Sequence, residues 1–309
     1  MIRYLVRRLL QGVLTFFFGA TFVVYALMFA NQNDPLQALA GERPISDSVR
    51  QTLTERYHLN EPFIVQYGYY MRGIFQGDFG TSLTNRPISE LLENAWPNTA
   101  RLAVMAVIFA ALIGIVAGVV AGIRRTGIFD HTTLIVTLVL ISIPIVVLAP
   151  LMQLFFGVEL RWFPRHRGSR PGLLRADAPG DGAGRGSLAT YSRLTRTSVV
   201  ENLRADYVRT AKAKGLTRNR VIGVHVLRNS LIPVITYIGV DLGGLMAGAI
   251  VTEGVFNIPG VGSQLFRGIT TEDGPLVVGF VSILVIIFIL ANLIVDLLYA
   301  VLDPRIRYE

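Results

Sequence analysis

Five apolar runs, each long enough to cross a lipid bilayer as a helix, dominate this sequence of 309 residues. Crossing the hydrocarbon core takes about 20 apolar residues, and in lipid only helices and closed barrels satisfy the hydrogen bonds of the backbone. Hydrophobic residues make up 52% of the chain and charged residues only 16%, so the runs predict an all-α polytopic membrane protein. The runs are 9–30, 100–123, 133–158, 231–252 and 276–302.

The basic residues predict which side of the membrane each loop occupies, because short cytoplasmic loops are enriched in Lys and Arg. Three arginines precede the first run, and the loop 193–230 is basic and holds the only two lysines, Lys212 and Lys214. The N-terminus and this loop are therefore predicted to be cytoplasmic. The expected parts are a head with the first helix (1–30), a small folded external loop (31–99) and a transmembrane domain (100–309).

Two further patterns concern local structure. Gly114, Gly118 and Gly122 recur at every fourth position, which places them on one helix face and lets another helix approach closely. Pro144 and Pro150 lie inside the run 133–158 and remove backbone donors, so a kink is expected there.

A cleaved signal peptide is the alternative for the first run, but the run is longer than the usual apolar region of about 7–15 residues. Within the external loop, 46–59 has the spacing of a short helix.

The segment 161–186 does not fit this plan, because it holds six arginines and two aspartates. Each charged residue at the centre of a span costs about 2.5–3.5 kcal/mol, so this segment is not expected to cross the membrane. Yet two loops predicted to be internal, at 124–125 and 193–230, require an even number of crossings between them. Either the chain has five spans with an exposed loop, or a local sequence alteration replaced a sixth helix. The second interpretation is preferred.

Several function classes are excluded or disfavoured by what the sequence lacks. Without cysteine there is no thiolate catalysis or disulfide, and the four scattered histidines predict no metal site. No phosphate-binding P-loop occurs, so the chain is not its own ATPase, and no catalytic residue is assigned. A membrane-embedded enzyme is disfavoured because Ser142 and Ser282 have no evident base. Nucleic acid is not expected as a partner, since the basic residues flank apolar runs.

Eight motifs, in order along almost the whole chain except 161–186, give a family resemblance. The sequence resembles the integral-membrane permease subunits of the peptide and nickel class of ABC importers. The motifs are DPLQALAGERP (34–44), RYHLNEPFIVQYGYY (56–70), GDFGTSL (77–83), WPNTARL (96–102), DYVRTAKAKGL (206–216), LRNSLIP (227–233), VTEGVFNIPGVG (251–262) and NLIVDLLYAVLDPRIRY (292–308).

The resemblance implies a type I ABC-importer permease fold in the bacterial cytoplasmic (inner) membrane, with six spans where five are clear. The implied partners are a second homologous permease, two cytoplasmic ATPase subunits (or one fused), and an extracytoplasmic substrate-binding protein. ATP and Mg would be bound by the ATPase subunits, so no cofactor is expected in this chain. Di- or oligopeptides are the expected cargo, with nickel or another small solute as the alternative. An ATP-independent channel or carrier is the alternative of a different class.

The resemblance also places a coupling motif, through which the ATPases would drive the permease, in the basic loop. The expected coupling residues are Arg209, Thr210, Ala211, Lys212, Lys214 and Gly215, with Arg209 where the family pattern has glutamate. Gly215 is able to adopt the positive φ of a tight turn between two short helices. Ala211 is expected to face the groove of a partner, and the basic side chains to steer toward an acidic rim. From the residues alone, an ordinary cytoplasmic loop without a partner is the alternative.

Acidic residues in or near the apolar runs are candidates for a substrate path. A charged side chain is costly within a span, so its presence there indicates a functional role as the first hypothesis. Asp241 and Glu253 are the candidates, and Asp296 is a weaker one. The alternative is that these carboxylates lie at membrane interfaces, or bind arginines or helix ends.

Overall fold

The computed structural model of the chain describes residues 10–12, 14–16, 21–29, 47, 51, 54–55, 58, 60–160, 177–246 and 250–302. Side chains are described for all of these except 27–29, 157, 177–185 and 294–302. The described part is helical and contains no β-strand, so the all-α fold class is confirmed. Most of 46–59 and all of 161–176 lie outside the described residues.

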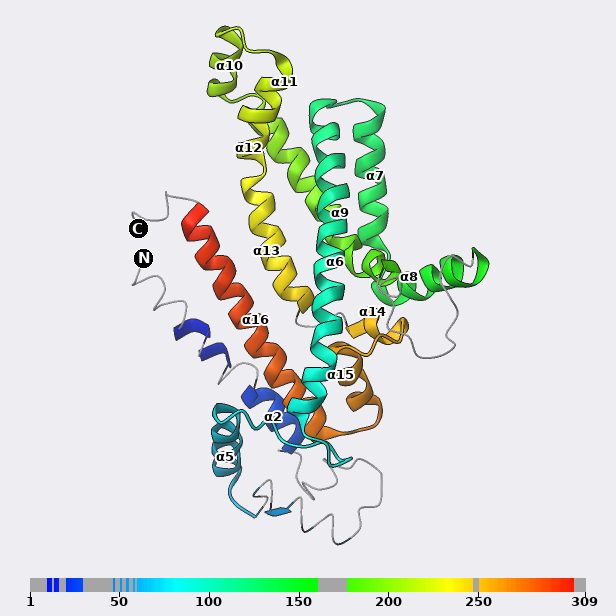
Figure 1. Cartoon of the computed structure of the whole chain (residues 1–309), viewed down its shortest axis with the longest axis vertical. Helices are drawn as coiled ribbons and strands as arrows, with labels where there is room; N and C mark the ends of the chain where they lie inside the picture. Colours follow the sequence, from blue (N-terminus) through cyan, green and yellow to red (C-terminus); the bar gives the residue numbers. More distant parts are fainter. Residues whose placement is uncertain are drawn as a thin grey trace. The chain divides into compact units, whose positions relative to one another are not determined.

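The described helices are shown along the chain in Figure 1. They are α2 (Phe22–Phe29), α5 (Phe63–Phe75), α6 (Ile88–Ile123), α7 (Ile128–Ser142), α8 (Ile145–Met152), α9 (Asp177–Asn202), α10 (Asp206–Ala213), α11 (Arg218–Arg220), α12 (Leu227–Ser230), α13 (Ile232–Met246), α14 (Ile250–Val255), α15 (Val261–Thr270) and α16 (Gly274–Leu302), with π-helical segments η2 (Gln153–Glu159) and η4 (Val221–Val226).

Two compact units make up the chain. Unit 1 comprises residues 1–99 and 246–293, and unit 2 comprises residues 100–245 and 294–309. Helix α6 begins in unit 1 and continues into unit 2. The expected division of the sequence at residues 30 and 99 stays a prediction.

Among the described residues, α6 and α16 are each long and apolar enough to cross a membrane. Two bent pairs, α7 with α8 and α11–α12 with α13, qualify if each pair counts as one span. The number of spans and the cytoplasmic N-terminus therefore stay predictions. Helix α6 begins at Ile88, so the last residues of the expected external loop are already helical and continue into the run that was predicted to start at residue 100.

The kink expected in 133–158 is confirmed at Pro144, and it is too large for one straight span. Helices Ile128–Ser142 and Ile145–Phe156 meet at 103°. Ile143 is extended, with φ −82° and ψ 122°, because the ring of a following proline disfavours the helical conformation. Pro150, in contrast, lies inside α8, which continues through it.

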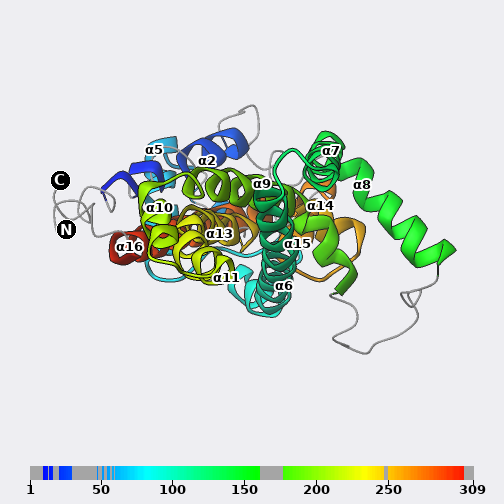
Figure 2. The ribbon, with the colours of Figure 1, turned by 90° about the horizontal axis from the view of Figure 1, so that it is seen from above.

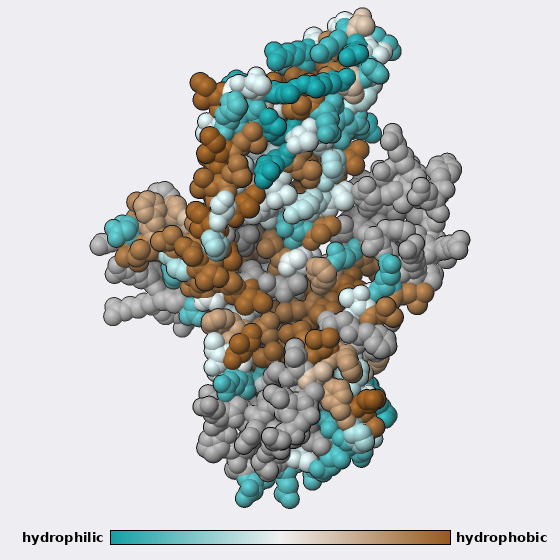
Figure 3. All heavy atoms as spheres, turned by 180° about the vertical axis from the view of Figure 1, so that it is seen from behind, coloured by the Kyte–Doolittle hydropathy of each residue, from teal (hydrophilic) through white to brown (hydrophobic). Residues whose placement is uncertain are grey.

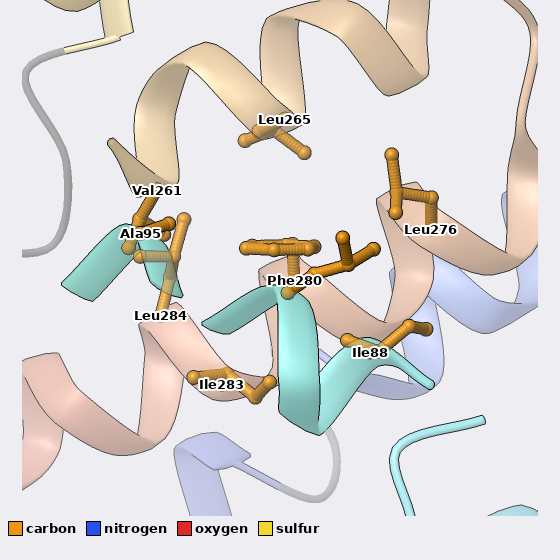
Figure 4. Packing of buried hydrophobic residues seen from close by; sticks show 9 residues of the cluster. Ile88, Ala95, Val261, Leu265, Leu276, Phe280, Ile283 and Leu284 are labelled. Carbon is orange, nitrogen blue, oxygen red and sulfur yellow. The ribbon is translucent and has the colours of Figure 1, made fainter. Parts of the chain in front are cut away.

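The core of unit 1 is formed by the start of α6 together with α15 and α16 (Figure 4). Phe280 of α16 is fully buried and lies among Leu265, Leu276 and Ile88. These apolar side chains bring three segments together that are distant in the sequence. Burying a side chain of this kind contributes about 1.5–3 kcal/mol, so this cluster holds the short helix α15 in place.

Unit 2 is built around α9, which packs against α6, α7, α8 and α12. Figure 2 shows α9 beside α6 and α13, and Tyr191 of α9 is fully buried with Ala110 of α6 and Val234 of α13. The glycine face of α6 makes the contact possible: a Cβ atom added to Gly118 would lie 2.4 Å from the carbonyl oxygen of Ser192. The predicted close helix approach along Gly114, Gly118 and Gly122 is confirmed.

Helix α9 overlaps the end of the segment 161–186. The helix begins at Asp177, so the last part of this segment belongs to a helix of 26 residues, about 39 Å long at 1.5 Å per residue. Neighbouring helices cover its buried side chains from Ala189 to Val199. The charged side chains of 161–186 lie outside those described, so the choice between five spans and a replaced sixth helix stays a prediction. In Figure 1 the α6–α7 and α9–α10 connections lie at the same end of unit 2, as expected for the two loops that were predicted to be internal.

Candidate functional site

The basic loop of the sequence folds into a helical elbow made of α10, the turn 214–217 and α11. Asp206 in the first turn and Lys212 in the last turn of α10 complement the helix dipole. The helix ends in a Schellman motif, in which the Leu216 N–H donates to the Ala211 carbonyl (3.3 Å) and the Gly215 N–H to the Lys212 carbonyl (3.0 Å). Gly215 has φ +77°, so the positive φ expected there is confirmed.

The inner face of the elbow is an apolar cluster. Val208 and Ala211 of α10 are buried with Val199 of α9 and with Val221 and Val226 of η4. Leu216, next to the glycine, packs against the same cluster. The elbow is therefore anchored to α9 and has a defined orientation within unit 2.

Ala211 does not lie where the sequence argument expected it. Its side chain is only 5% exposed and belongs to the inner cluster, so it does not face outward toward a partner. The reason is helical spacing: Ala211 follows Val208 by three residues, and residues three apart share a helix face.

The outer face of the elbow is polar and basic. Arg209, Thr210, Lys212 and Lys214 are exposed, as are Gly215 and both arginines of α11. Arg209 lies 3.5 Å from Asp206 in an exposed pair, which contributes little to stability. Figure 3 shows this end of unit 2 as a hydrophilic surface above hydrophobic helices. The structure thus brings together every expected coupling residue except Ala211 on one accessible surface.

An ion pair that the sequence argument missed joins the helices behind the elbow. Arg196 of α9 donates from both Nε and Nη2 to the carboxylate of Asp130 at the start of α7, with a distance of 2.8 Å for Nη2 to Oδ2. The Asp130 side chain is 2% exposed and also accepts the Thr126 N–H at 3.0 Å. No sequence pattern indicates this pair, because the sequence does not show which carboxylate Arg196 contacts.

Asp241, one candidate for a substrate path, is a half-buried residue of α13 in unit 2. Its Oδ2 accepts the hydroxyl of the fully buried Tyr191 at 2.6 Å. The ring of Tyr237, which is 38% exposed, stands edge-on to Tyr191 at 5.9 Å. The tyrosine holds one carboxylate oxygen in place, and the carboxyl group stays partly accessible.

Glu253, the other candidate, is fully buried in unit 1. Its Oε1 accepts the hydroxyl of Thr99 at 2.8 Å, and its Oε2 accepts the Ser263 N–H at 3.0 Å. Burial raises the pKa of this carboxyl group, and the hydrogen bonds from Thr99, Ser263 and Gly262 oppose that rise. Glu253 thus caps α15, whose N-cap Gly260 has no side chain to do so. The side chain of Asp296 lies outside those described.

We therefore expect Glu253→Gln to destabilise unit 1, because glutamine has one acceptor oxygen where Glu253 uses two, so either the Thr99 hydroxyl or the Ser263 N–H loses its acceptor. A buried donor left without an acceptor costs about 1–3 kcal/mol. The thermal unfolding midpoint of the purified protein should fall, while Glu93→Gln, at an exposed position of α6, leaves it unchanged. Equal midpoints for the two variants would show that Glu253 is not the cap of α15.

Comparisons with known proteins cover nearly the whole chain. The family described as binding-protein-dependent transport system inner membrane component matches residues 114–308, and the corresponding N-terminal family matches residues 1–103. The chain is 38% identical to a dipeptide transport system permease protein of Alkalihalophilus pseudofirmus and 37% identical to one of Escherichia coli, with all of both chains covered in each case. It is 33% identical, again over both full chains, to an oligopeptide transport system permease protein of Haemophilus influenzae.

Proposed function

The chain belongs to the family of inner membrane components of binding-protein-dependent transport systems, and we propose that it is the permease subunit of an ATP-driven importer of di- and oligopeptides. The observation that carries the proposal is the elbow, whose outer face is basic and exposed and whose inner face is packed into the helices of unit 2. An ordinary loop needs no such packed core beneath its charges.

Separate ATPase subunits bind the elbow, and their motion is transmitted through it to the permease. Arg209, Thr210 and Lys212 meet an ATPase subunit, with Lys214 at the edge of the contact, while Gly215 sets the turn. Val199 of α9 and Val119 and Ile123 of α6 pack in or against the cluster that holds α10, so a displacement of α10 moves both long helices. When ATP binding closes the ATPases, this motion switches the permease between its inward-open and outward-open states.

The partners follow from the class of transport system. It uses a binding protein that delivers the substrate and ATPase subunits that bind ATP and Mg. We propose one homologous second permease and two ATPase subunits, or one fused ATPase, for each complex. Peptides are the proposed cargo because the similar permeases are named for dipeptide and oligopeptide transport. Nickel or another small solute is the runner-up cargo.

A transport assay tests the proposed function directly. The chain is co-expressed with a homologous permease, ATPase subunits and a binding protein from the same organism, and the complex is reconstituted in lipid vesicles. We expect uptake of a labelled dipeptide that requires both ATP and the binding protein. Uptake of nickel but not of peptide would move the assignment to the runner-up cargo, and uptake without any ATPase subunit would end it.

Asp241 is proposed to line the substrate path and to interact with the ammonium group of a passing peptide. Asp241→Asn keeps an oxygen that accepts the Tyr191 hydroxyl but removes the charge, and a hydrogen bond to a charged group contributes about 1.5–3 kcal/mol. We expect peptide uptake to fall about tenfold or more, with normal assembly and normal ATP hydrolysis in the absence of peptide. Tyr191→Phe, which keeps the charge, should reduce uptake less. Wild-type uptake by Asp241→Asn would remove Asp241 from the path.

A further inference from the structure

Helix α5 exposes large apolar side chains within a stretch that the sequence argument placed in a polar external loop. Ile64 is 77% exposed and Phe75 is 72% exposed, and Val65 and Tyr69 are also exposed. Ile64 and Phe75 are eleven residues apart, which is close to three full turns, so they lie on one side of the helix. Arg72 is exposed on the same half of the helix surface.

The opposite face of α5 packs along the first apolar segment of unit 1. The Phe63 ring lies 5.9 Å from Phe22, and the Tyr67 ring lies 5.2 Å from Phe22. Further along α5, Met71 and Ile74 are buried with Phe16. The start of α5 therefore contacts the end of the first apolar segment, and the end of α5 contacts an earlier part of it. The two run antiparallel, and Figure 1 shows α5 beside α2.

The same face of α5 also contacts α16. The Tyr70 hydroxyl lies 2.7 Å from Ser282 Oγ and donates to the Val278 carbonyl at 3.3 Å. Val285, Ile286 and Ile289 of α16 pack against the cluster that contains Met71 and Ile74. These α16 residues lie inside Gly274–Leu293, a candidate span with a mean hydropathy of 2.9.

This placement determines the surroundings of the exposed face of α5. A helix attached alongside a membrane span, at the level of residues 278–289, shares the lipid that surrounds that span. Burying a side chain such as Ile64 or Phe75 contributes about 1.5–3 kcal/mol of free energy, which is lost if the side chain stays in water. Helix α5 has 13 residues, about 20 Å, which is too short to cross the bilayer and typical of an interfacial or re-entrant segment.

We propose that α5 is embedded in the outer leaflet of the membrane, with Ile64 and Phe75 in contact with lipid acyl chains. Arg72 extends along the helix toward the lipid headgroups, as long basic side chains do, and Tyr69 lies at the level of the interface. The external loop is then held to the membrane by α5. It is not a freely solvated domain in this part of the chain.

Site-directed spin labelling tests this placement, and a chain without cysteine suits it. Single cysteines at Ile64 and at Phe75 are labelled in the assembled complex, made with cysteine-free partner subunits and reconstituted in phospholipid vesicles. Relaxation by oxygen, which concentrates in lipid, is compared with relaxation by a water-soluble nickel chelate. Thr84→Cys, at an exposed position of the polar turn 82–86 and outside the candidate spans, is the aqueous control.

We expect oxygen to relax the labels at Ile64 and Phe75 more strongly than the nickel chelate does, with the reverse order at Thr84. Nickel accessibility at Ile64 and Phe75 equal to that at Thr84 would show that α5 is in water and would overturn the proposal. Labels at both sites that neither reagent reaches would overturn it too, because the face would then be covered by the binding protein or another subunit.

Discussion

We expect Gly118→Leu to prevent unit 2 from reaching its folded state. A Cβ atom at this position would lie 2.4 Å from the Ser192 carbonyl oxygen and 2.7 Å from the Thr195 Cβ, and the first of these atoms belongs to the backbone of α9. Overpacking a core costs about 1–3 kcal/mol, and occasionally more. A leucine here must separate two helices, so we place its effect at or above the upper end of that range.

The control for this prediction is Gly244→Leu, which adds the same side chain to another apolar helix. No atom lies within 4 Å of a Cβ built at Gly244, so the variant should fold as the wild type does. The measurements are the yield of monodisperse protein in detergent and its thermal unfolding midpoint. A Gly118→Leu protein with the wild-type yield and midpoint would contradict the tight α6–α9 contact.

We expect Gly215→Val to abolish peptide transport while leaving the chain folded in the membrane. The residue has φ +77° and no atom within 4 Å of an added Cβ, so the effect is conformational and involves no clash. A left-handed residue with a Cβ costs roughly 1–2 kcal/mol, and β-branching makes this conformation a genuine outlier. The turn should open, which displaces α10 from the position that an ATPase subunit recognises.

Gly215→Asn is the matched control, because asparagine is the residue that most often replaces glycine at this helix-end position. We expect the asparagine variant to retain much of the transport and the peptide-stimulated ATP hydrolysis that the valine variant loses. Both variants should insert and purify alike, since Gly215 is exposed. Normal peptide-stimulated hydrolysis by Gly215→Val would count heavily against the coupling role.

The sequence predicts those features that depend on a repeated local pattern. The apolar runs identify α6 and α16 as spans, the glycine spacing predicts the α6–α9 contact, and the motif around Gly215 predicts the turn of the elbow. In each case a few neighbouring residues are enough, because helix periodicity and backbone conformation are local properties.

Features that depend on partners distant in the sequence were not predictable in the same way. The polar helix α9 packs against α6, α7 and α12, whereas its composition alone suggests a loop. Glu253 was a candidate for a substrate path because it is acidic, whereas its role as the cap of α15 depends on Thr99 and on a helix start further along the chain. Ala211 is the exception, since its spacing from Val208 already indicated an inward position.

The most direct test of the central claim is cross-linking at neighbouring residues on opposite faces of the elbow. Lys212→Cys and Ala211→Cys are made in this cysteine-free chain, modified with a photoactivatable cross-linker and irradiated in the assembled complex. Lys212 is exposed and Ala211 is 5% exposed, so we predict an adduct with an ATPase subunit from position 212 and little or none from 211. No ATPase adduct from Lys212→Cys, in a complex that hydrolyses ATP in response to peptide, would contradict the account.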